Sequence, residues 1–279
     1  MADRSQIDWT DATFNPWLGC TKVSPACDHC YAEAWAKRSG LVQWGNNPRR
    51  ATSDAYWKQP HRWNREARAA GVRRRVFCAS LADVFDNQVD PAWRRELWDL
   101  IHQCDALDWL LLTKRPQNIA AMLPGGGDDP LNGIDRYATP WPWPHVWLGT
   151  TVENQEEADR RIPHLLAVPA RLRFLSCEPL LGPVDLREYI CHPASDWMIS
   201  PELALYWVIA GGESGPGARP MRPDWARSLR DQCQAAGVPF FFKQWGEWIV
   251  GDDISIEIRV GKKAAGRELD GREHNEFPS

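Results

Sequence analysis

The sequence predicts an α/β fold, a parallel β/α barrel that is partial or complete and carries irregular insertions. Two observations predict the class: short runs that are apolar on both faces recur along the chain, and helix-like segments separate several of them. Such runs are typical of buried parallel strands, and repeated strand–helix units form a parallel sheet with helices outside it. A third observation, the polar residues at the end of each run, favours the barrel.

The apolar runs are six expected strands, and three segments between them are expected helices. The helix at 223–237 begins with Pro-Asp and ends at Gly237, residues that commonly begin and end helices. The other two helices are expected at 91–104 and 156–167. The strands are expected within 76–86, 108–116, 145–154, 172–182, 206–215 and 238–246.

Polar side chains stand where each expected strand stops. In a β/α barrel these strand ends converge on one face, where active sites lie, whereas a doubly wound sheet gathers them at a single crevice. Six successive polar ends suit a ring better than a crevice, although such residues also simply begin solvated loops. They are Ser80, Asp83, Lys114, Arg115, Thr150, Glu153, Glu178, Glu213, Lys243 and Gln244.

The chain is expected to be one barrel domain over residues 1–279, with a cysteine-rich loop at 17–33 and a polar C-terminal tail. Irregular insertions are expected near 124–144 and 183–205. Hydrophobic residues make up 43 % and charged residues 25 %, which is ordinary for a globular protein. No run approaches the ~20 apolar residues that span a bilayer, and the first residues lack the apolar core of a signal peptide. We therefore expect a cytoplasmic protein without membrane contact.

Three of the eight cysteines lie in the short segment WLGCTKVSPACDHCYAE: Cys20, Cys27 and Cys30, spaced C-x6-C-x2-C. Thiols stay reduced in the cytoplasm, so clustered cysteines indicate metal binding or catalysis rather than disulfides. A helix is expected at 31–39, ending before Gly40, so the third thiolate would lie at a helix N-terminus, where the helix dipole favours negative charge.

Three interpretations of this loop remain open. The thiols could pack in the core, as free cysteines often do. They could hold structural zinc, which takes four ligands and would need a distant fourth. They could hold an iron–sulfur cluster, which usually takes four thiolates, so that three leave one iron open to a small molecule.

The loop and motifs along nearly the whole chain resemble a known family. The motifs are FNPWLGCTKVSPACDHCYAE, LTKRP, GTTVEN, SCEPLLG, GGESGPGARP, FFFKQWGEW and GKKAAGRELDGREHNEFP. They resemble the phage-associated three-cysteine-motif family, whose members are similar to radical S-adenosylmethionine (SAM) enzymes with a TIM-type barrel. The spacing departs from the commonest superfamily pattern, C-x3-C-x2-C, by three residues.

The resemblance implies a [4Fe–4S] cluster on Cys20, Cys27 and Cys30, with SAM chelating the open iron. An electron donor would reduce the cluster, and cleavage of SAM would give a 5′-deoxyadenosyl radical for hydrogen abstraction. His29 would face the adenine. The candidate SAM contacts, chosen by strand-end position alone, each have a structural alternative such as a helix cap or a core hydrogen bond, and no catalytic residue is assigned. These candidates are Ser80, Asp83, Thr150, Glu153 and Glu178.

The superfamily's Gly-Gly-Glu motif follows the second strand and holds the SAM amino group. Here Gly211-Gly212-Glu213 comes near the end of the series, so we do not transfer that role to Glu213. The alternative for this stretch is a tight glycine turn with a solvated carboxylate.

Charge is uneven along the chain. Residues 37–75 hold eleven Lys or Arg against Asp54 and Glu66, giving +9, while the whole chain carries -4. Cations interleaved with aromatic rings are typical of nucleic-acid binding, although such runs are often just solvated faces. The expected contacts are Trp57, Trp63, Arg73, Arg74 and Arg75.

Two functions from different classes follow. The first is a radical SAM-type enzyme that modifies or repairs a nucleic acid or nucleotide. The second is a non-catalytic nucleic-acid-binding protein stabilised by zinc or by a structural cluster. Analysis of the purified protein for iron and sulfide, as opposed to zinc, would distinguish the two.

Overall fold

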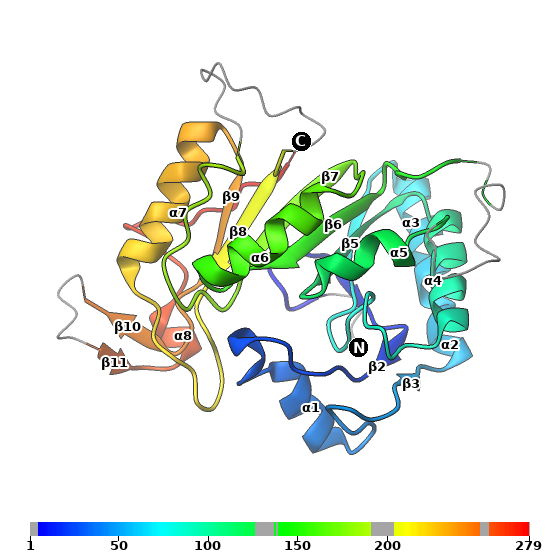
Figure 1. Ribbon diagram of the computed structural model, residues 1–279, viewed down its shortest axis with the longest axis horizontal. Coiled ribbons are helices and arrows are strands. Elements are labelled where there is room, and N and C mark those ends of the chain that lie inside the picture. The colour runs from blue at the N-terminus through cyan, green and yellow to red at the C-terminus, as the bar shows by residue number, and fades with distance from the viewer. Residues whose placement is uncertain (1–4, 126–136, 138, 191–203, 252–256, 279) are drawn as a thin grey trace. The chain divides into compact units, whose positions relative to one another are not determined.

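The computed structural model describes residues 5–125, 137, 139–190, 204–251 and 257–278 (Figure 1). Its main sheet has seven strands in the order β1-β4-β5-β6-β7-β8-β9, so strands that follow one another in the chain are neighbours in the sheet. Strand β1 runs parallel to β4, β4 to β5, β7 to β8 and β8 to β9. This topology confirms the α/β class and is that of a partial β/α barrel.

Each expected strand is shorter than its apolar run, because the run continues into the loop that follows the strand. One strand of the main sheet was not expected: β1 is only three residues long, too short for a pattern to stand out. The strands are β1 (Ala12–Phe14), β4 (Arg74–Cys78), β5 (Leu107–Thr113), β6 (Val146–Thr151), β7 (Leu172–Cys177), β8 (Trp207–Gly211) and β9 (Phe240–Gln244).

The chain divides into two compact units, described separately here. The first comprises Met1–Lys22, Ala32–Gly149 and Val168–Leu172. Its helices include α3 (Gln59–Ala70), which contacts β4, β5 and α4 (Pro91–Gln103). It also holds α1 (Tyr31–Ser39, from Ala32 on), α2 (Asp54–Trp57), η2 (Pro116–Asn118), α5 (Ile119–Met122) and an antiparallel pair of β2 (Trp17–Leu18) with β3 (Arg50–Ala51).

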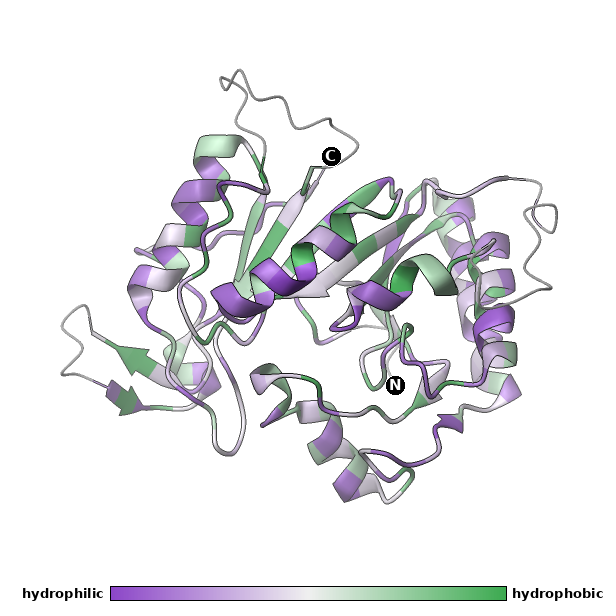
Figure 2. Cartoon of the chain, in the orientation of Figure 1, coloured by the Kyte–Doolittle hydropathy of each residue, from purple (hydrophilic) through white to green (hydrophobic). Residues whose placement is uncertain are grey.

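The second unit comprises Val23–Tyr31, Thr150–Ala167 and Arg173–Ser279. Helix α7 (Pro223–Ala236) contacts β8 and β9, and Figure 2 shows hydrophobic residues along these strands against a mixed helix surface. The other elements are η1 (Pro25–Cys27), α6 (Gln155–Leu166), β10 (Trp248–Val250), β11 (Glu257–Arg259) and α8 (Lys262–Ala265).

Two expectations about irregular segments can be compared with the structure only in part. Most of the insertions near 124–144 and 183–205 lies outside the described residues. The C-terminal tail, in contrast, was expected only to be polar, yet it has residues that pack in the core. The Phe277 ring lies 5.2 Å from that of Trp207, and the Phe242 N–H donates to the His274 carbonyl. The tail therefore packs against the strands of the second unit.

Among the described residues, no helix is both long enough and apolar enough to cross a membrane.

Candidate functional site

The three loop cysteines belong to short elements at the start of the chain. Cys20 follows β2 and lies in the first unit, whereas Cys27 ends η1, Cys30 directly precedes α1, and both lie in the second unit. Cys20 and Cys30 are half-buried and Cys27 is buried, and all three are free thiols. Within the described part of the chain, no three His, Cys, Asp or Glu side chains gather closely enough to hold a metal ion.

In the first unit, the Arg115 guanidinium lies against Cys20. Arg115 Nη1 donates to Cys20 Sγ at 3.4 Å, and Nη2 donates to the Thr21 carbonyl at 2.8 Å. Burial, aided by the Asp83 charge, raises the pKa of Cys20 to about 11, while Arg115 opposes this rise. A guanidinium that donates to sulfur favours the thiolate, the form that binds metal.

Asp83 holds Arg115 in this position. Its carboxylate accepts from Arg115 Nη1 at 3.0 Å, from Thr113 Oγ1 at 2.8 Å and from the Phe85 N–H at 2.9 Å. Asp83 is buried. Ser80, three residues earlier, accepts from the Asn15 amide at 3.1 Å. Asp83 and Ser80 therefore both form hydrogen bonds within the protein, as the structural alternative to SAM binding predicts.

In the second unit, Glu153 joins the cysteine loop to α6. The carboxylate is fully buried, and Oε1 accepts from the Ala26 N–H at 3.1 Å. Its Oε2 accepts from Arg161 Nη1 at 2.8 Å, and Arg161 also pairs with Glu157 at 3.0 Å. Both oxygens of this expected SAM contact are thus engaged within the unit. Thr150, three residues earlier, is also fully buried.

Glu213 is buried rather than solvated, contrary to the simple turn that we gave as its alternative. It accepts from Arg219 Nε at 2.8 Å and Nη2 at 2.6 Å, and His29 Nδ1 lies 3.1 Å from its Oε2. Burial alone would raise the pKa of Glu213, but the hydrogen bonds from Arg219 and His29 outweigh it and lower the pKa. The carboxylate is therefore held as an anion.

The glycines before Glu213 have a packing reason. A Cβ on Gly212 would lie 1.9 Å from the Trp245 carbonyl oxygen, so only glycine allows the two backbones to approach. A Cβ on Gly211 would lie 2.8 Å from Glu178 Oε1. These two glycines therefore allow close packing, whereas the turn in this stretch lies later, at residues 216–217.

A second polar group lies at the ends of β7 and β9. Lys243 Nζ pairs with Glu178 Oε1 at 2.9 Å, and both side chains are mostly buried. The neighbouring Gln244 donates to the Gly212 carbonyl at 3.3 Å, while its own Oε1 is buried with no hydrogen-bond partner among the described residues. Buried acceptors are normally satisfied, so an unpaired one indicates room for a donor from water or a ligand.

The residues expected to contact nucleic acid are mostly buried or paired within the protein. Trp63 is only 1 % exposed, and the Arg74 guanidinium lies 5.1 Å from its ring centroid, so neither face is open to a base. Trp57 is half-buried and meets the Phe14 ring edge-on. The three arginines all form ion pairs: Arg73 with Asp108 at 2.7 Å, Arg74 with Glu66 at 3.7 Å and Arg75 with Asp11 at 3.3 Å.

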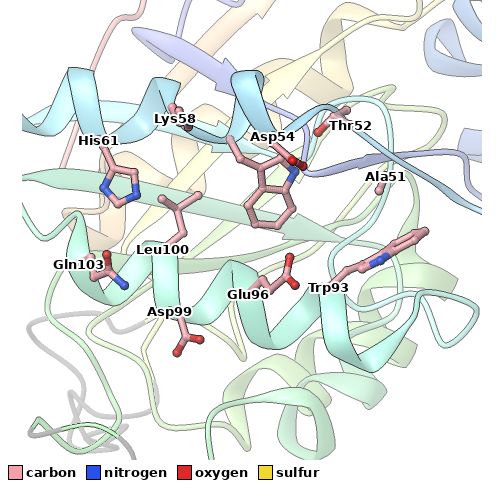
Figure 3. A pocket seen from close by; sticks show the side chains of 11 residues that line it. Ala51, Thr52, Asp54, Lys58, His61, Trp93, Glu96, Asp99, Leu100 and Gln103 are labelled. Carbon is pink, nitrogen blue, oxygen red and sulfur yellow. The ribbon is translucent and has the colours of Figure 1, made fainter.

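A cavity of about 580 Å³ lies in the first unit between α4 and the segment from β3 to α3 (Figure 3). Its carboxylates outnumber its one lysine, so it does not favour a phosphate group. The spacing of three and four residues along α4 could have identified this face from the sequence. The lining residues are Ala51, Thr52, Asp54, Trp57, Lys58, His61, Trp93, Glu96, Asp99, Leu100 and Gln103.

Two arginines with roles in these contacts were missed by the sequence analysis. Arg161 lies four residues after Glu157 on α6, a spacing that indicates an ion pair. Arg219 follows a glycine-rich stretch, and no local pattern connects it to Glu213 and the cysteine loop.

Comparison with known proteins identifies one family. The family model described as "Protein of unknown function (DUF5131)" matches residues 4–278. No curated protein and no solved structure matches the chain.

Proposed function

We propose that this chain, which belongs to the DUF5131 family, is a radical SAM-type iron–sulfur enzyme. The observation that carries the proposal is the set of three free thiols within eleven consecutive residues. Thiolates are the usual ligands of iron–sulfur clusters, and three of them leave one iron for a small molecule. The parallel β/α topology, whose strand ends commonly form active sites, supports the same class.

The donor set fits such a cluster in its chemistry, because it consists of three cysteines. Cys20, Cys27 and Cys30 form no disulfide, and the Arg115 guanidinium donates to the Cys20 sulfur. Hydrogen bonds to ligand sulfur are one of the means by which a protein adjusts a cluster's potential. With SAM bound at the open iron, the cluster would supply one-electron cleavage of SAM and hydrogen-atom abstraction from a substrate.

The chain's own residues would bind and orient SAM. Gln244 Oε1 is a buried acceptor that lacks a partner in the described residues. This oxygen suits the ammonium group of an amino acid, which needs an acceptor. The His29 side chain, which is 34 % exposed, would contact the adenine.

For the substrate, we propose a nucleic acid or nucleotide, contacted by residues other than the arginines first expected. Arg50 and Arg65 are exposed, and neither forms an ion pair among the described residues. They remain able to pair with phosphate, unlike Arg73 and Arg75, whose charges are matched by carboxylates.

Metal analysis of anaerobically purified protein tests the class. We expect brown protein with iron and sulfide, and 5′-deoxyadenosine after incubation with SAM and a reductant. Replacing Cys20, Cys27 or Cys30 by Ala should abolish iron binding, whereas Cys233→Ala, a matched change of a buried thiol, should leave it intact. Colourless protein with stoichiometric zinc would overturn the proposal and favour the non-catalytic, metal-stabilised binding protein.

A further inference from the structure

We infer that Glu153 and the Glu213–Arg219 pair are positioning residues, which hold the loop around Cys27 in one conformation before any metal binds. The inference deepens the proposed function and rests on it for the identity of the ligand. The contacts themselves lie entirely within the second unit and stand without the metal.

The first anchor acts on the peptide before Cys27. Glu153 follows β6, and its Oε1 accepts from the Ala26 N–H at 3.1 Å although the two residues are 127 positions apart. Arg161 supports the carboxylate from α6, since its Nη1 donates both to Glu153 Oε2 and to the Thr151 carbonyl at 2.8 Å. A carboxylate fixed by a buried arginine cannot rotate away from Ala26 at low cost.

The second anchor contacts residues that precede and follow Cys27 in the sequence. Arg219 Nη2 donates to the Pro25 carbonyl at 2.9 Å, and Nη1 pairs with Asp28 at 3.2 Å. Glu213 fixes this guanidinium with two hydrogen bonds and also lies 3.1 Å from His29 Nδ1. Four positions around Cys27, namely 25, 26, 28 and 29, are thereby tied to two strand ends.

Gly217 completes the second anchor. A Cβ at this position would lie 2.8 Å from His29 Nε2. The backbone φ is +79°, a conformation that residues with a side chain rarely adopt. The glycine-rich stretch after Glu213 can therefore lie directly on the imidazole ring. This packing restricts His29 and, through the backbone, its neighbour Cys30.

The loop needs these anchors because its own structure is slight. Residues 25–27 form a single 3₁₀ turn whose N-cap, Ser24, makes no side-chain capping bond. A short turn of this kind is marginal alone, so an untethered loop would sample many conformations. Ligands that are held in place before binding lose less entropy when a cluster forms, and residues that contact the ligands commonly provide that order.

Amide hydrogen exchange of the metal-free protein tests the anchors without enzyme activity. We expect peptides covering 23–31 to exchange at least about tenfold faster in Glu153→Gln, Glu213→Gln and Arg219→Ala than in wild type, with peptides from α7 unchanged. Glu157→Gln is the matched control for Glu153, because Glu157 pairs with the same arginine but not with the loop. Arg222→Ala is the control for Arg219, because Arg222 pairs with the exposed Asp224.

Chelator competition then tests the link to metal. After reconstitution with iron and sulfide, the three anchor variants should lose iron to a chelator several-fold faster than wild type and the controls, and Arg219→Lys should restore part of the difference. Unchanged loop exchange in the anchor variants would overturn the inference, as would iron loss equal to wild type. Faster exchange with a wild-type protein that binds no iron would support the anchors and overturn the proposed function.

Discussion

The Arg49–Asp86 ion pair in the first unit tests whether an arginine of the basic segment 37–75 stabilises the fold. Asp86→Asn removes the negative charge while keeping the side chain's size. Arg49 Nε donates to Asp86 Oδ2 at 2.8 Å, and Nη2 lies 2.6 Å from the same oxygen. Each side chain is only 1 % exposed, so the change leaves a buried guanidinium without its counter-ion.

The expected cost follows from the remaining partners. Removing one member of a buried ion pair commonly costs roughly 3–5 kcal/mol. Arg49 keeps the carbonyls of Gly45 and Asn47, each at 2.8 Å, and Thr21 Oγ1 at 2.7 Å. These acceptors pair Nη1 and Nη2 but satisfy neither the Nε–H nor the charge, so we expect a loss of about 3 kcal/mol.

Urea unfolding followed by pulsed amide exchange measures this cost unit by unit. Peptides from β4 report on the first unit and peptides from β8 on the second, which matters because two units need not unfold together. We expect the free energy of unfolding to fall at β4. The control is Glu66→Gln, whose 53 % exposed side chain pairs with Arg62 at 3.6 Å and should change stability by about 0–1 kcal/mol. A loss below about 1 kcal/mol for Asp86→Asn would refute the reasoning.

Three further predictions concern other parts of the chain. Trp63→Ala should destabilise the first unit by about 3–5 kcal/mol because the ring is 1 % exposed; a stable variant with weakened nucleic-acid binding in a gel-shift titration would show that the ring is a stacking surface instead. Burial raises the pKa of Cys233 to about 12 from 9.0, so the stability that this thiol contributes is complete below pH 9 and is lost as pH rises to 12. The urea midpoints of Cys233→Ala and wild type should therefore converge between these two pH values, and a constant difference would contradict the assignment. If Arg50 and Arg65 contact phosphates, replacing both by Gln should reduce the slope of log K against log salt by about 0.9 per lost contact on duplex DNA, and an unchanged slope would exclude them.

Local patterns were sufficient for much of the architecture. Each of the six apolar runs overlaps a strand, and the helices at 91–104, 156–167 and 223–237 begin or end within a residue of the expected positions. The helix after Cys30 spans Tyr31–Ser39, as its composition indicated. These features depend on periodicity and on helix-end residues, which act over a few positions of the chain and are therefore readable from the sequence.

The charge pattern of the sequence did not indicate how many charged residues form ion pairs in the folded protein. The +9 count of residues 37–75 was correct, yet it omits the carboxylates that lie outside the segment. Asp11, Asp86 and Asp108 neutralise Arg75, Arg49 and Arg73 once the strands align. A sum of charges along the chain cannot include partners that only folding brings near.

The sequence by itself determined the α/β class and the clustering of three thiols in one short loop, because strand-length apolar runs and cysteine spacing are local properties. Only the tertiary structure decided what the strand-end carboxylates touch. Glu153 meets the Ala26 N–H across 127 positions, and Arg219 meets Asp28 across 191. Such pairs form because parallel strands carry distant segments to neighbouring ends of a sheet, where a buried carboxylate must find a donor. Which donor it finds depends on the packed backbone and has no trace in the spacing of residues.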